Sequence, residues 1–309
     1  MRRRTFGVIT GGSGSSKFVT ALHRYSEENG YEFGFICNVG DNFWFHSLYV
    51  CPDIDIITYA LCGKLDERKG WGIKGDSKKF IGMLASLGYK SWFDLGDEDL
   101  ALSVIRTELI RRGFRLSQIT KRIAKSLRIR PSLIPATDDN VQTYMQTSVG
   151  KIHLQEFWVK MKGRPKVLGV DYKGAKTAIP NPEAMRLLSK NVIILPANPI
   201  TSILPTLALR GVRKKLRHSN VVAISPFIGK TIFSGPAVKL MRALRLEPSS
   251  YGVASLYSDF LKVFLVDNDE DQSEIRKITE LGIECIKRNI RIKSEADKRS
   301  ITREIMNML

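Results

Sequence analysis

Residues 6–17, with the sequence FGVITGGSGSSK, constrain the fold of this chain more than any other stretch. An apolar run, a cluster of glycines and a following amphipathic pattern predict a strand, a tight turn and the start of a helix. Glycine lets backbone N–H groups approach a ligand closely, and a helix N-terminus attracts anions. We therefore expect Gly11, Gly12 and Gly14 to bind the phosphates of a ligand, with Lys17 beside them. A strand-to-helix turn without a ligand is the alternative, since such turns are common and this one matches neither the Walker A loop nor the strict G-x-G-x-x-G motif.

Polar side chains follow the next apolar strand, which is predicted at residues 33–39. Asn38 and Asp41 lie at its end, where ligands bind in parallel α/β sheets. Asp53 and Asp55 stand at the start of a predicted helix, and helix capping explains one of these acids better than both. Together with Asp41, they form a set of carboxylates that could hold a hard cation such as Mg²⁺.

The remaining chain alternates apolar strands with helical patterns, which predicts an α/β fold with a parallel sheet. Residues 77–130 differ, because three successive stretches space their apolar residues three and four positions apart. This pattern predicts a helical insertion with helices at 79–87, 99–112 and 116–127. Short strands at 143–147 and 151–159 predict a small β-hairpin region. Apolar strands return at 191–195, 220–224 and 259–266.

The composition argues against several classes of protein. With 43% hydrophobic and 26% charged residues, the 309-residue chain has the composition of a globular protein. No apolar run reaches the ~18 residues of a membrane span, and residues 6–9 are too few for a signal-peptide core of ~7–15 residues, so we expect a cytoplasmic location. The four cysteines have no C-x-x-C spacing, which argues against a zinc site and against a disulfide framework.

The net charge of +18 suits anionic partners such as phosphates, nucleotides or nucleic acid. The basic residues are scattered over several predicted helices, and the sequence contains no helix-turn-helix, RNP or zinc-finger motif. We therefore expect a solvated basic surface and no nucleic-acid site.

An ordered set of short motifs adds a more specific indication. These motifs span residues 6–267 and include GGSG at 11–14, NVGD at 38–41, CPDID at 51–55, RKGWGI at 68–73, LGDEDLA at 95–101, IRTE at 105–108, HLQEF at 153–157, NPITSI at 198–203, SP at 225–226 and SGPAVKLM at 234–241. The set resembles the 2-phospho-L-lactate transferases of deazaflavin coenzyme biosynthesis. One such block alone is weak evidence, whereas the ordered set is specific to that family.

The resemblance implies a fold and a reaction. The expected fold is a Rossmann-like, doubly wound and mainly parallel sheet, which with the helical insertion forms a single α/β domain over residues 1–309. The implied reaction moves a 2-phospholactyl or phosphoenolpyruvyl group from a guanosine-diphospho donor to the terminal hydroxyl of 7,8-didemethyl-8-hydroxy-5-deazariboflavin. GMP leaves, Mg²⁺ is required, and the family forms homodimers.

The resemblance also assigns roles to residues. We expect Asp41 and Asp55 to hold the metal and activate the hydroxyl, with Asp53 supporting them and Asn38 as a substrate-binding residue. The glycine loop and the helix start at Ser234 and Gly235 are expected to bind the nucleotide and its diphosphate. Further residues assigned to that binding are Asn198, Thr201, Ser202, Ser225 and Lys239. Trp44 and Trp71 could stack on the deazaflavin ring, with core packing as the alternative for each.

Several positions depart from the usual family pattern, including the loss of a proline at Ser16 and the change of a serine to Ala197. Asn42 stands where a second acid is usual, Asp94 replaces a basic or amide residue, and Leu204 replaces a glycine. The alternative function is that of a non-catalytic regulator that binds a nucleotide sugar, as in the related gluconeogenesis-factor proteins.

Overall fold

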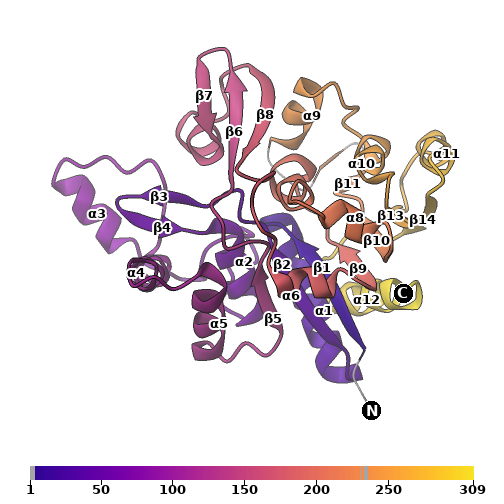
Figure 1. Cartoon of the computed structure of the whole chain (residues 1–309), viewed down its shortest axis with the longest axis horizontal. Helices are drawn as coiled ribbons and strands as arrows, with labels where there is room; N and C mark the ends of the chain where they lie inside the picture. The colour runs from indigo at the N-terminus through magenta and orange to yellow at the C-terminus, as the bar shows by residue number, and fades with distance from the viewer. Residues whose placement is uncertain (1–3, 230, 233–235) are drawn as a thin grey trace.

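A parallel sheet of seven strands forms the centre of the computed structural model, which describes residues 4–229, 231–232 and 236–309. The strand order is β14-β13-β10-β9-β1-β2-β5 (Figure 1). The strands are β1 (Thr5–Thr10), β2 (Glu32–Cys37), β5 (Ser132–Pro135), β9 (Asn191–Ile194), β10 (Asn220–Ile224), β13 (Val263–Asp267) and β14 (Glu284–Arg288). In β1, β2 and β13 nearly every residue is buried, because both faces of the sheet are covered.

The order in which the strands are added reverses once, between β1 and β9. Strands β1, β2 and β5 extend the sheet in one direction, and β9, β10, β13 and β14 extend it in the other. This is the doubly wound topology that the sequence predicted. In such sheets the reversal leaves a crevice beyond the carboxyl ends of the central strands, where ligands bind.

Helices cover the sheet and continue the same core. They are α1 (Ser13–Asn29), α2 (Pro52–Leu61), α6 (Pro182–Leu187), α7 (Leu204–Leu207), α8 (Val212–Leu216), α9 (Ala237–Ala243), α10 (Ser250–Tyr257), α11 (Gln272–Glu280) and α12 (Glu295–Asn307). Helix α1 contacts both α2 and α12 (Figure 1). It begins at Ser13, earlier than the predicted start at Phe18, so that Gly14 already lies in its first turn.

The predicted helical insertion is confirmed. It consists of α3 (Lys79–Ser86), α4 (Asp97–Arg111) and α5 (Leu116–Ser126), and α5 contacts strand β5 at the edge of the sheet. Leu109, Ile119 and Ile123 form a small apolar cluster between α4 and α5. Ahead of the insertion, the short antiparallel strands β3 (Phe43–Phe45) and β4 (Leu48–Val50) contact α4 through β4.

The predicted hairpin is right as far as His153 and wrong beyond it. Strands β6 (Gln142–Thr147), β7 (Gly150–His153) and β8 (Val167–Lys173) form an antiparallel sheet above the parallel one in Figure 1. Residues predicted to extend β7 instead form the π-helix η1 (Glu156–Lys160). Its buried side chains explain the difference, because Leu154 and Phe157 lie three positions apart, as on a helix, while Trp158 stays exposed.

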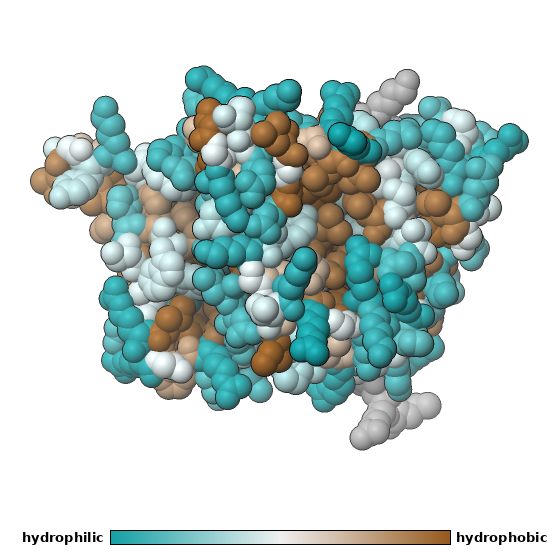
Figure 2. Space-filling model, turned by 45° about the horizontal axis from the view of Figure 1, so that its top comes forward, coloured by the Kyte–Doolittle hydropathy of each residue, from teal (hydrophilic) through white to brown (hydrophobic). Residues whose placement is uncertain are grey.

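Three shorter elements complete the described chain: the π-helix η2 (Pro199–Ile203) and the strand pair β11 (Phe227–Ile228) and β12 (Thr231–Ile232). The predicted helix start at Ser234 and Gly235 lies outside the described residues. Within them, no helix has the length and apolar character to cross a membrane. Figure 2 shows a face that is mostly hydrophilic, with hydrophobic residues gathered in a recessed area near its middle.

Candidate functional site

A cavity of about 690 Å³ lies where the topology predicts a ligand. Its lining includes the loop after β1, the start of α2, and the segment that follows β9. Helix η1 and residues near the start of α4 close other sides of it. The cavity therefore combines segments that are far apart in sequence at the carboxyl edge of the central strands.

The glycines of the first loop are required by close packing. A Cβ atom on Gly11 would lie 2.3 Å from the Cβ atom of Ser202, and one on Gly12 would lie 2.4 Å from Oδ1 of Asp53. Gly14 is restricted in the same way by the backbone oxygen of Pro196, at 2.8 Å. Gly12 and Gly14 also line the cavity, whereas Gly11 lies behind it. The loop therefore both packs tightly and borders the space for a ligand.

Asn38 holds two carboxylates together at the end of β2. Its Nδ2 atom donates to Oδ1 of Asp41 and to Oδ2 of Asp53, each at 2.9 Å. Its Oδ1 atom accepts from the backbone N–H of Gly40 at 2.8 Å, which fixes the orientation of the amide. Asn38 itself is fully buried. It positions the pair of acids and does not line the cavity.

Burial makes the ionised form of both paired acids unfavourable. Burial raises the pKa of Asp41 well above its usual value, and the neighbouring Asp53 raises it further. Burial also raises the pKa of Asp53 to about 6, against the opposing effect of its hydrogen bonds from Asn38 and Ser202. Both acids line the cavity. Two buried carboxylates that share one amide donor favour a proton or a cation between them.

Asp55 has a different partner. The guanidinium of Arg106, on α4, donates to Oδ1 of Asp55, and its other terminal nitrogen donates to the backbone oxygen of Tyr49 at 3.1 Å. Arg106 is only 1% exposed. Burial raises the pKa of Asp55 to about 6, and the charge of Arg106 counteracts this effect.

The expectation that three carboxylates surround one ion is therefore not met in this form. Within residues 4–229, 231–232 and 236–309, no three acid, histidine or cysteine side chains converge as metal ligands. Asp41 pairs with Asp53, while Arg106 neutralises Asp55 from the side of the insertion. Helix capping does not explain the acids either, because no side chain caps the start of α2.

Asn198 brings a free donor to the cavity. Its Oδ1 atom caps η2 by accepting from the backbone N–H groups of Ile200, at 3.0 Å, and Thr201, at 3.3 Å. Its Nδ2 atom has no hydrogen-bond partner among the described residues, although the side chain is only 2% exposed. Thr201 and Ser202 line the same wall. A buried amide without a partner, at the edge of a cavity, suits an anionic or carbonyl oxygen of a ligand.

Besides Gly11 and Asn38, three more of the predicted binding residues do not line the cavity. Lys17 extends from α1 to the backbone oxygen of Ile292, at 3.3 Å. The hydroxyl of Ser225 contacts that of Ser250 at 2.8 Å in the core. Lys239 donates to backbone oxygens of the turn that follows η1. Each polar group is used by a contact that is distant in sequence, so the local motif could not show where it points.

Several cavity residues were missed by the sequence interpretation. Gln155 approaches Asp41, with 3.5 Å between Nε2 and Oδ2, and it lies within the HLQEF motif, which could have indicated it. Trp158, Lys162 and Asp99 also line the cavity. Lys162 adopts a left-handed backbone conformation with φ of 52°, which no local pattern predicts for a lysine.

The two tryptophans named from the sequence lie in different places. Trp71 lines the cavity and is 43% exposed, so it remains a candidate for contact with a ligand. Trp44 is 52% exposed, packs against Tyr49 and does not line the cavity.

Acidic side chains outnumber basic ones in the lining of the cavity. Among the described residues, five aspartates border the cavity, namely Asp41, Asp53, Asp55, Asp94 and Asp99, and Lys162 is the one basic residue that does so. A phosphate-bearing ligand would be repelled by this lining unless cations lie between them. Oxygen donors of this kind are those that Mg²⁺ prefers. The residues present therefore fit a divalent cation.

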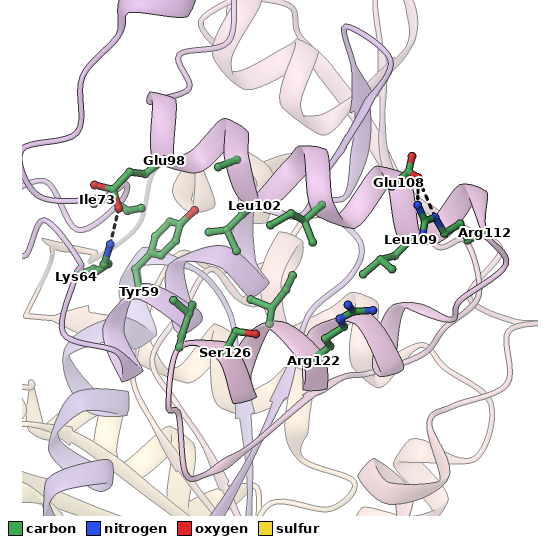
Figure 3. A pocket seen from close by; sticks show the side chains of 14 residues that line it. Tyr59, Lys64, Ile73, Glu98, Leu102, Glu108, Leu109, Arg112, Arg122 and Ser126 are labelled. Atoms are coloured by element: carbon green, nitrogen blue, oxygen red, sulfur yellow. Dashed lines mark hydrogen bonds and ion pairs between the residues drawn. The ribbon is translucent and has the colours of Figure 1, made fainter.

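A second cavity, of about 550 Å³, lies between α4 and α5 (Figure 3). Its walls are apolar, with Leu102 and Leu109 among them, and its charged residues stand at the ends. Lys64 pairs with Glu98, and Arg112 pairs with Glu108. Because these charges mostly neutralise one another, this cavity offers little directed chemistry. Tyr59 lines both cavities and separates them.

Comparison with known proteins places the chain in one family. A sequence model described as "2-phospho-L-lactate transferase CofD" matches residues 7–306. The protein named 2-phospho-L-lactate transferase of Methanosarcina mazei is 36% identical to this chain, in an alignment that covers 86% of this chain and 88% of the relative. The protein of the same name from Methanopyrus kandleri is also 36% identical, and the alignment covers 98% of this chain and 96% of the relative. The corresponding protein of Methanosarcina acetivorans is 35% identical over 97% and 98%.

A solved structure agrees on the fold. A member of the UPF0052 family from Bacillus halodurans superimposes with a TM-score of 0.65 at 14% identity and covers 99% of both chains. At this identity the likeness concerns the fold alone. Since the family model and the relatives match nearly the whole length, this chain belongs to the 2-phospho-L-lactate transferase CofD family of enzymes.

Proposed function

We propose that the protein transfers a 2-phospholactyl or phosphoenolpyruvyl group from a guanosine-diphospho donor to the terminal hydroxyl of 7,8-didemethyl-8-hydroxy-5-deazariboflavin, with release of GMP. The observation that carries the proposal is the cavity at the topological switch point, where Asp41 and Asp53 share the amide of Asn38 and Asp55 borders the same space. Family membership supplies the class of reaction.

The donor is proposed to bind along the wall formed by the glycine loop and η2. Gly12 and Gly14 border the cavity at the start of α1, where a helix N-terminus favours phosphate. The free Nδ2 atom of Asn198 supplies a hydrogen bond, and Lys162 supplies a positive charge. Lys162 thus takes the role that the sequence interpretation gave to Lys17 and Lys239.

The chemical step needs little covalent help from the protein. The acceptor oxygen attacks the phosphorus of the phospholactyl group, the bond from that phosphorus to the GMP oxygen breaks, and the hydroxyl proton passes to a carboxylate. We assign that proton to Asp55, because Arg106 binds only one of its oxygens and its pKa of about 6 suits a base at neutral pH. Positioning and charge neutralisation supply the remaining catalysis.

Asp41 and Asp53 are the residues proposed to hold Mg²⁺. Their mutual repulsion and burial favour a cation, and Gln155 and Asn38 orient their oxygens. When bound, Mg²⁺ would neutralise the diphosphate of the donor and the leaving GMP. These roles differ from the expectation from the sequence in one respect, because Asp53 takes the place of Asp55 beside Asp41 at the cation.

The test is a direct assay of the reaction. Purified protein is incubated with the deazariboflavin, Mg²⁺ and either the phospholactyl or the phosphoenolpyruvyl guanosine diphosphate, and products are followed by mass spectrometry. We expect the phosphodiester product and GMP in equal amounts with one of the donors. Absence of product with both donors, together with a rise in melting temperature on adding a UDP-sugar, would instead support the nucleotide-sugar regulator.

A further inference from the structure

We propose that Trp158 is the platform on which the planar ring system of the acceptor stacks, and that Lys239 positions it from outside the cavity. This inference rests on the proposed function, because it names the part of the same site that takes the acceptor. It concerns a residue that the sequence motifs did not single out and a lysine that they placed on a phosphate.

Trp158 occupies an unusual position in the fold. It lies on the π-helix η1, whose neighbouring residues Leu154 and Phe157 are buried, yet 40% of Trp158 is exposed. The side chain lines the cavity. Large aromatic residues normally gain by burial, so one left partly open at a cavity has a surface available for a ligand. Single-turn π-helices occur frequently at functional sites.

The turn after η1 supports the ring. A Cβ atom placed on Gly163 would lie 3.0 Å from Cε3 and from Cζ3 of Trp158. The bare backbone of this glycine therefore lies against the indole, and its φ of 62° also favours glycine. A ring packed this closely against the main chain is restricted in its orientation before any ligand arrives.

Lys239 fastens that turn to the body of the protein. From α9, its Nζ atom donates to the backbone oxygens of Gly163, Arg164, at 3.4 Å, and Pro165, at 2.9 Å. The same ammonium group lies 5.6 Å from the ring centre of Phe157, on η1. One lysine thus binds both the turn and the helix that carry Trp158, although it lies more than seventy residues away in sequence.

The chemistry of this wall favours the acceptor ring over the guanine of the donor. Leu154 and Val159 border the cavity beside Trp158, and Trp71 also contributes to its lining. Recognition of guanine needs hydrogen bonds to the edge of the base, which aliphatic and aromatic side chains do not supply. A tricyclic ring presents a larger flat surface for stacking on an aromatic side chain than guanine does. Its hydroxyl-bearing chain could then reach the aspartates that line the same cavity.

The experiment compares Trp158→Leu and Trp158→Phe with the control Trp44→Leu, which alters an exposed tryptophan outside the cavity. We expect Trp158→Leu to raise KM for the deazariboflavin by about tenfold or more, as for the loss of one stacking partner. KM for the donor should stay within about twofold, and Trp158→Phe should retain most of the affinity. Trp44→Leu should behave as the unchanged protein, with circular dichroism confirming that every variant is folded.

Lys239→Met tests the positioning role. It should raise the acceptor KM selectively, with little change in kcat, and its effect should not add to that of Trp158→Leu, because both act on one ring. Additive effects, or an equal rise in both KM values, would overturn the role of Lys239.

Direct binding separates this inference from the proposed reaction. The deazariboflavin is titrated without donor while its own fluorescence is followed, and GMP is titrated separately by calorimetry. Weaker deazariboflavin binding in Trp158→Leu, with unchanged GMP binding, would support the platform even if no transfer occurs. Unchanged binding of the deazariboflavin in that variant, weaker binding of GMP alone, or no deazariboflavin binding by the unchanged protein would overturn it.

Discussion

Among single residues, the acids show most clearly what local sequence can and cannot indicate. Their positions after β2 and at the start of α2 correctly predicted that Asp41, Asp53 and Asp55 would border one cavity. The partner of Asp55 could not be predicted, because it is Arg106, which follows Asp55 by 51 residues. A short motif shows which residue types are near in sequence, whereas charge compensation depends on contacts across the fold.

Asn198 provides a test of donor binding. In Asn198→Asp the remaining Oδ1 atom can still cap η2, but the free Nδ2 donor becomes a carboxylate oxygen facing the ligand. We expect KM for the guanosine-diphospho donor to rise by about tenfold or more, since a hydrogen bond is replaced by repulsion, and the melting temperature to fall, since a carboxylate is added at a buried position. Steady-state kinetics and thermal unfolding measure both. An unchanged donor KM would remove Asn198 from the proposed donor site.

His153 should make stability fall at acid pH. Burial between aromatic side chains lowers its pKa to about 4, compared with about 6.5 in the unfolded chain. Between these values the unfolded state binds more protons, so stability decreases as pH falls from about 6.5 toward 4.

His153→Gln should reduce that loss, by an amount on the order of 2 kcal/mol between pH 7 and pH 4.5. Urea unfolding at both pH values gives the difference. The control is His218→Gln, because His218 is exposed. Equal pH dependence in His153→Gln and the unchanged protein would contradict the account.

Among the helices and strands, those that could be predicted have apolar residues at regular spacing. The inner strands and the helices α3, α4 and α5 were predicted closely, because their apolar residues repeat with the period of a strand or a helix. Helix η1 was predicted as part of a strand. Its side chains alternate only over a few residues, and the buried positions depend on packing against α9 and the turn at 163–165. Tertiary contacts override the local preference there.

The pair of Arg106 and Asp55 connects α4 of the insertion to helix α2, and breaking it is expected to lower the stability. Arg106→Met leaves Asp55 buried without its partner, which should lower stability by about 3–5 kcal/mol. Arg112→Met is the matched control on the end of the same helix, where an exposed pair with Glu108 contributes about 0.5 kcal/mol or less.

Chemical denaturation of the variants measures this contribution. The double variant Asp55→Asn with Arg106→Met should recover much of the lost stability, because it removes the uncompensated charge. A loss in Arg106→Met as small as that in Arg112→Met would show that the pair does not fasten the insertion.

For the whole molecule, a parallel α/β sheet was predictable from the alternation of apolar strands with helical patterns, and its doubly wound topology followed from the family resemblance. The residues that line its cavity could be predicted only in part. The aspartates were expected there, but Trp158 and Lys162 come from a segment whose conformation the sequence did not show. We also propose, from the family resemblance, that the protein is a homodimer, and light scattering should then give twice the 34.9 kDa of one chain.

The central claim is that the buried pair of Asp41 and Asp53 acts in the transfer of the phospholactyl or phosphoenolpyruvyl group and does not stabilise the fold. The measurement is the rate of product formation by Asp41→Asn, taken together with its melting temperature. Because the substitution relieves repulsion between two buried acids, we predict an unchanged or higher melting temperature and a loss of turnover of about 10²-fold or more. The control Asp171→Asn alters an exposed acid paired with Lys151 and should leave both quantities unchanged. Full turnover in Asp41→Asn, or a loss explained by unfolding, would contradict the account.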